Sequence, residues 1–60
     1  SHMTLSHEFR APLSSTLMCL ESLLEYVTDI AMKRTIMIVI SQINLLICLV
    51  NDILDVKMIE

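Results

Sequence analysis

Apolar residues recur at alternating steps of four and three in both halves of the 60-residue chain. This spacing keeps apolar side chains on one edge of an α-helix and is typical of heptad seams. The first seam consists of Leu13, Leu17, Leu20, Leu24 and Val27. The second consists of Ile36, Ile40, Ile43, Ile47, Val50 and Leu54, with Val39, Leu46 and Ile53 widening it on one flank. The pattern therefore predicts two amphipathic helices.

The composition restricts how these helices can be joined. The chain has no Gly and one Pro, which argues against β-hairpins and phosphate-binding glycine loops and favours an all-α fold. We expect a helical hairpin, with helix 1 at about 4–26, a loop at about 27–31 and helix 2 at about 32–58. Thr28 or Asp29 is expected to cap the second helix. Residues 1–3 resemble the remnant of a cleaved affinity tag, so the domain is taken as 4–60 and His2 is not a ligand candidate.

The short length and the wide second stripe predict self-association. A 60-residue chain buries a small share of its surface, so a core of its own is marginal. The second stripe is too wide for one neighbouring helix, and two hairpins that pair into a four-helix bundle would cover both of its sides. A homodimer is therefore expected.

The second half is also apolar enough to raise the question of a membrane. The run from Ile36 to Val50 is interrupted by Ser41, Gln42 and Asn44 and is shorter than the roughly 18 residues that a spanning helix needs. No membrane span is predicted, and a membrane-associated hairpin is kept as an alternative. Three residues lie outside the stripe and should meet another chain or domain: Ile38, Leu45 and Leu49.

Charge and cysteine usage exclude further classes. The net charge is -3 and the four basic residues, Arg10, Lys33, Arg34 and Lys57, are scattered, so no nucleic-acid partner is expected. Cys19 and Cys48 have no metal-type spacing and are interpreted as small buried residues in a reducing compartment, with a disulfide between them as the alternative. No metal site is predicted.

The segment Ser6-His7-Glu8-Phe9-Arg10-Ala11-Pro12-Leu13 carries the candidate chemistry. On a helix, Phe9 and Leu13 would turn toward the bundle, whereas His7 would face solvent with Arg10 on its side. A neutral imidazole has a free ring nitrogen that can attack a phosphoryl donor. Glu8 could hold the other nitrogen, as the orienting acid does in a triad.

Pro12 leaves two interpretations open. Inside a helix it would remove one backbone hydrogen bond and loosen the turn after His7. Alternatively it starts the helix, and residues 6–11 form a frayed leader in which His7 is an ordinary solvated side chain.

The segment SHEFRAPL resembles the H-box of sensor histidine kinases, and VNDILDVKMIE resembles the end of the same domain. The resemblance covers Thr4 to Glu60 and implies the dimerisation and histidine phosphotransfer domain of a two-component system. It implies that His7 is the phosphoacceptor, that Glu8 gives acid/base assistance, and that Arg10 is a candidate contact for a phosphate or carboxylate. The phosphate would come from ATP and pass to an aspartate of a response regulator.

The same resemblance implies partners that lie outside this chain. ATP and Mg would be bound by a separate catalytic domain with glycine boxes, so this Gly-free chain should hold no cofactor and be inactive by itself. We expect a cytoplasmic location, also where the whole kinase is membrane-anchored. Ala11 replaces the usual Thr or Asn, which predicts weak phosphatase activity because alanine cannot hydrogen-bond a water. A non-catalytic dimerisation module of a degenerate kinase is the alternative function.

Overall fold

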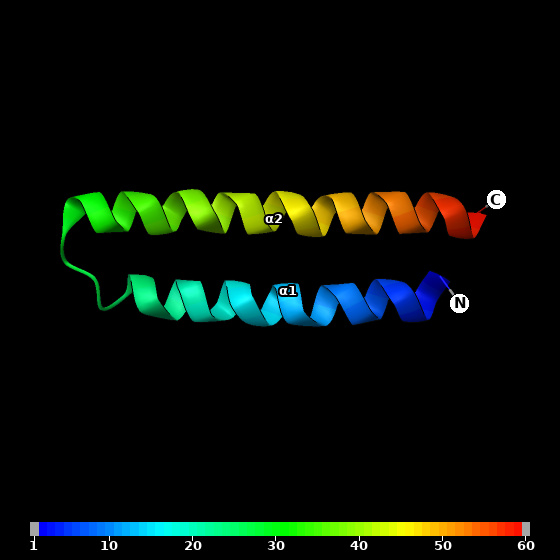
Figure 1. Cartoon of the computed structure of the whole chain (residues 1–60), viewed down its shortest axis with the longest axis horizontal. Coiled ribbons are helices and arrows are strands. Elements are labelled where there is room, and N and C mark those ends of the chain that lie inside the picture. Colours follow the sequence, from blue (N-terminus) through cyan, green and yellow to red (C-terminus); the bar gives the residue numbers. More distant parts are fainter. Residues whose placement is uncertain (1, 60) are drawn as a thin grey trace.

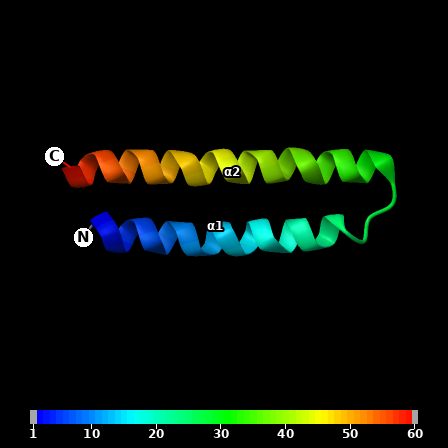
Figure 2. The same ribbon diagram turned by 180° about the vertical axis from the view of Figure 1, so that it is seen from behind.

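The computed structural model is an antiparallel pair of helices, α1 (His2–Leu24) and α2 (Ile30–Ile59), which Figures 1 and 2 show from opposite sides. The structure describes the backbone of residues 2–59 and the side chains of residues 8–52. The rod measures 47 × 14 × 9 Å. The predicted all-α helical hairpin is confirmed.

The two predicted seams form the contact between the helices. Ile36 is 9% exposed and is the buried hydrophobic residue among the described side chains. The other described seam residues are half-buried: Leu13, Leu17, Leu20, Leu24, Val27, Ile40, Ile43, Ile47 and Val50. The side chains of Ile53 and Leu54 lie outside the described residues. The four-three spacing therefore identifies the side of each helix that meets the other.

The loop is shifted by two residues from its predicted place. Residues 25–29 connect the helices, and α1 ends in a tightened turn in which the Glu25 and Tyr26 amides donate to the carbonyls of Ser22 and Leu23. Asp29 caps α2, because its Oδ2 accepts from the Met32 amide at 2.9 Å and its carbonyl accepts from Lys33 at 2.9 Å. Asp29 is thus the predicted cap, and α2 begins at Ile30 rather than at 32.

Pro12 lies inside α1. The interpretation in which Pro12 starts the helix after a frayed leader is wrong, because the backbone is helical from His2 onward. Pro12 has no amide hydrogen, so the carbonyl of Glu8 lacks its helical donor. The Pro12 carbonyl in turn accepts from Thr16 Oγ1 at 2.8 Å. The proline therefore removes one bond from the H-box turn without ending the helix.

A single hairpin leaves much of its apolar surface uncovered. The surface of the chain is 4668 Å², whereas a compact monomer of 6.9 kDa is expected to expose about 4,000 Å². Cys19 and Cys48 are exposed free thiols, so their predicted burial is wrong. Both cysteines lie outside the seams, and in a hairpin of two helices the other helix covers only the seam positions.

The length argument against a membrane span is also wrong. Within the described residues, Ile30–Asp52 is a 23-residue stretch long and apolar enough to cross a membrane, judged by length and composition. This stretch is longer than the run Ile36–Val50 because it also includes the first turns of α2, with Lys33 and Arg34 among their residues. The apolar helix of a soluble bundle can have the same length and composition.

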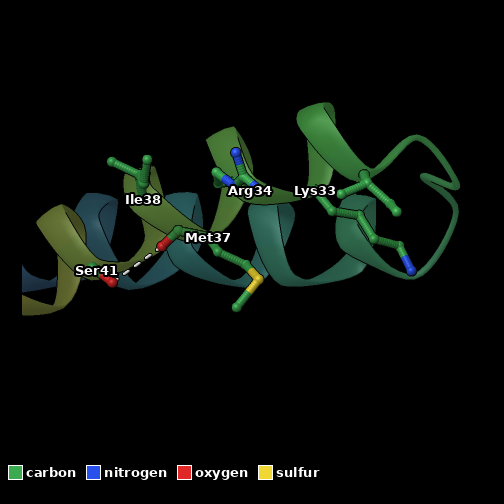
Figure 3. A pocket seen from close by; sticks show the side chains of 6 residues that line it. Lys33, Arg34, Met37, Ile38 and Ser41 are labelled. Atoms are coloured by element: carbon green, nitrogen blue, oxygen red, sulfur yellow. Dashed lines mark hydrogen bonds between the residues drawn. The ribbon is translucent and has the colours of Figure 1, made fainter.

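The exposed surface of α2 contains a groove near the loop. An open groove on the first turns of α2 is lined by Ile30, Lys33, Arg34, Met37, Ile38 and Ser41 (Figure 3). Figure 3 also shows the Ser41 hydroxyl bonded to the Met37 carbonyl, a distance of 3.1 Å. This bond satisfies the hydroxyl within its own helix and leaves the groove without a polar anchor there.

Candidate functional site

The H-box segment is fully helical in this structure. His7 belongs to α1 and lies three residues before Arg10 and seven before Ser14, so the three positions share one face of the helix. The side chain of His7 lies outside the described residues. Glu8 is exposed. The helix thus provides a regular frame for His7, while the predicted contact between His7 and Glu8 stays a prediction.

Arg10 connects the H-box to the C-terminal part of α2, which lies beside it at the open end of the hairpin. Its Nε and Nη2 donate to Oδ1 of Asn51, at 2.9 and 2.6 Å, and these bonds are among its contacts. Both residues are half-buried. Asn51 belongs to the segment VNDILDVKMIE, so the two segments that carry the family resemblance are in direct contact across the hairpin.

A second groove identifies one broad side of the hairpin. It is lined by Leu23 and Val27 from the end of α1 and its loop, and by Ala31, Met32, Thr35 and Ile36 from α2. Leu23 and Met32 therefore lie on the same side of the rod. Residues seven positions apart lie on the same side of a helix, so this side also includes Thr16 and Phe9 on α1 and Val39 and Leu46 on α2.

We call this side the apolar face, defined by Phe9, Thr16, Leu23, Met32, Val39 and Leu46. All six side chains are exposed, and Phe9 is 49% exposed, although it was predicted to turn toward the bundle. The reason is that Phe9 lies beside the seam, where one hairpin supplies no neighbour to cover it. Val39 and Leu46 are the predicted flank of the wide stripe.

The opposite side of the hairpin is polar toward its open end, whereas steps of seven from Asn51 and Asn44 lead to the exposed Met37 and Ile30 near the loop. It includes Arg10 and Ser14 from α1 and Asn44 and Asn51 from α2, which we call the polar face. His7 lies one heptad before Ser14 on this side of α1. The helix positions of the candidate phosphoacceptor and of Arg10 are therefore on the side away from the apolar face.

The described residues contain no group of three or more His, Cys, Asp or Glu side chains able to hold a metal ion. The whole sequence contains no Gly, so it has no glycine box with which to cradle a nucleotide phosphate.

Asn51 is not among the site residues predicted from the sequence. Its partner Arg10 is 41 residues away, and the pairing depends on how far the two helices are offset along their axes. The available signal in the sequence was that Asn51 lies in VNDILDVKMIE, the second segment that resembles the family.

The fold is a two-helix hairpin whose apolar face is left uncovered. Residues 3–60 match the His Kinase A (phospho-acceptor) domain, HisKA, and the chain belongs to this family. No curated protein and no solved structure matches the chain. Membership makes it a phosphoacceptor and dimerisation domain of the histidine kinases, which are transferases of two-component signalling.

Proposed function

We propose that this chain accepts a phosphoryl group from ATP on His7 and passes it to an aspartate of a response regulator. The single observation that supports this proposal most is the HisKA match over residues 3–60, within which SHEFRAPL supplies a histidine followed by an acid. The continuous helix through Pro12 adds support, because it makes His7 part of a folded element.

The proposed step is a displacement at phosphorus. A lone pair on one nitrogen of the neutral imidazole attacks the γ-phosphorus of ATP, an N–P bond forms, the bond to the bridging oxygen breaks, and ADP leaves. Glu8 accepts a hydrogen bond from the other ring nitrogen and offsets the positive charge that develops on the ring. In the second step the N–P bond breaks as a receiver aspartate takes the phosphoryl group.

ATP and Mg²⁺ are assigned to a separate catalytic domain, since phosphate binding of that kind relies on glycine-rich loops. We further propose a cytoplasmic location, where ATP is available to that domain.

We also propose that two hairpins pair through the apolar face into a four-helix bundle. Five large apolar side chains on this face are exposed in the single hairpin: Phe9, Leu23, Met32, Val39 and Leu46. Contact with a second copy would cover them while leaving the polar face, which carries the His7 position, open to catalytic and receiver domains. The arrangement accounts for the marginal core of one chain.

Labelling tests the phosphoacceptor. The fragment is mixed with the catalytic domain of its own kinase and radiolabelled ATP, and acid-labile phosphate on the fragment is measured. We expect label on the wild type and on a His2→Gln variant, and none on His7→Gln. Label that persists in His7→Gln would refute the role of His7. Absence of label on a folded, dimeric wild type would favour the assembly-only module of a degenerate kinase.

A membrane-associated hairpin is the second candidate, and the 23-residue apolar stretch Ile30–Asp52 favours it. The two candidates differ in plain buffer. The signalling dimer should sediment as a dimer without detergent and stay below phosphatidylcholine vesicles in a flotation gradient. A chain that needs detergent to stay in solution and floats with the vesicles would support the membrane hairpin instead.

A further inference from the structure

We propose that Asn51 is a positioning residue for the phosphoacceptor site, acting through Arg10. The inference rests on the proposed function of His7, because it assigns a role to the residue that orients a neighbour of that histidine. The observation that carries it is the pair of hydrogen bonds from the Arg10 guanidinium to Oδ1 of Asn51.

The two bonds hold the head group of a long side chain. Arginine loses considerable rotamer entropy when its head group is held in one place, so its orientation needs a partner. Nε and Nη2 are adjacent donors of one planar fork, and their joint contact with a single oxygen defines both the position and the plane of the guanidinium. Asn51 therefore restricts Arg10 to the polar face.

The position matters because of the distance along α1. Arg10 follows His7 by three residues, which is a rise of about 4.5 Å on the same side of the helix. A phosphoryl group that arrives at His7 brings negative charge, and guanidinium groups bind phosphoryl oxygens in a geometry set by the fork. A guanidinium held on the same side of the helix as His7 needs less reorganisation during transfer than one that samples solvent.

The alternative is that Asn51 serves packing alone. Two variants separate the possibilities. Asn51→Leu keeps the size and shape of the side chain but removes the acceptor oxygen, whereas Asn51→Asp keeps an oxygen in the place of Oδ1. Positioning through the oxygen predicts loss with leucine and retention with aspartate, whereas packing alone predicts retention with both, because both side chains keep the shape of asparagine.

The experiment measures kcat and KM for the fragment as a substrate of its own catalytic domain, with ATP in excess. We expect Asn51→Leu to lower kcat about tenfold, the effect of losing a hydrogen bond to a charged group, with KM unchanged. Asn51→Asp should stay within about threefold of the wild type. Gln42→Leu, at an exposed amide of α2 that belongs to neither the polar face nor the apolar face, is the control and should leave kcat unchanged.

A double-variant cycle tests whether Asn51 acts through Arg10. Arg10→Gln should lower kcat about tenfold, and adding Asn51→Leu to it should cause no further loss. Full additivity of the two losses, or wild-type kcat in Asn51→Leu, would overturn the proposal. Helix content by circular dichroism and dimer mass are measured for each variant, so that loss of fold is not counted as loss of positioning.

Failure of this proposal can be told from failure of the function itself. If His7→Gln abolishes label while Asn51→Leu is phosphorylated normally, the phosphoacceptor stands and the positioning role is rejected. If His7→Gln is still labelled, both are rejected.

Discussion

Replacement of Leu46 tests which side of the hairpin meets a second copy. Leu46 is 45% exposed on the apolar face, and complete burial of a leucine side chain contributes about 2 kcal/mol. Covering the exposed part is therefore worth about 1 kcal/mol per protomer, or about 2 kcal/mol in a symmetric dimer. Leu46→Ala should raise the dimer dissociation constant about thirtyfold. Leu46→Glu should raise it further, since a buried carboxylate without a partner costs several kcal/mol.

The adjacent leucine provides the control. Leu45 is 55% exposed but lies outside the apolar face, on the outer side of α2, so Leu45→Glu should leave the dimer intact. The assay is sedimentation equilibrium over a concentration series in plain buffer, with helix content checked by circular dichroism. A Leu46→Glu chain that remains as dimeric as the wild type would refute the assignment of the face. Dissociation by Leu45→Glu but not by Leu46→Glu would place the dimer contact on the outer side of α2.

Two further predictions concern the cap and the H-box. Asp29→Ala removes the acceptor for the Met32 amide and should lower stability by about 1 kcal/mol, a fall in Tm of about 4–8 °C, while Asp29→Asn should remain near the wild type. Equal melting temperatures for Asp29→Ala and the wild type would contradict the cap. Ala11→Thr should speed the loss of phosphate from the response regulator, because threonine can hydrogen-bond a water where alanine cannot, and a rate equal to that of the wild type would contradict this reasoning.

Much of the fold could be predicted because each seam is defined by the spacing of residues along the sequence alone. The spacing of Leu13, Leu17 and Leu20, and that of Ile36 and Ile40, defines one edge of a helix whatever the surroundings, and these residues are the ones that meet across the hairpin. The loop was predicted two residues too late although Asp29 was one of the two predicted caps, because the exact ends of a helix depend on local geometry that spacing does not specify.

The site could be predicted only in part. The H-box identifies His7, Glu8 and Arg10 by resemblance, but the contact between Arg10 and Asn51 depends on the offset of two helices, which no spacing within one helix reveals. The burial of Cys19 and Cys48 was predicted wrongly, because an apolar residue type is no guide to the side of the helix on which it lies.

The short loop has a consequence for how the molecule assembles. The loop of residues 25–29 joins the two helices. Because it is short, the first contacts between the helices, near Val27 and Ile36, require little loss of chain entropy. Each further layer of the seam lies next to one already formed, and chains with such local contacts fold within microseconds to milliseconds. Pairing of two hairpins is bimolecular, so we expect a fast phase that is independent of protein concentration and a slower one that accelerates with it.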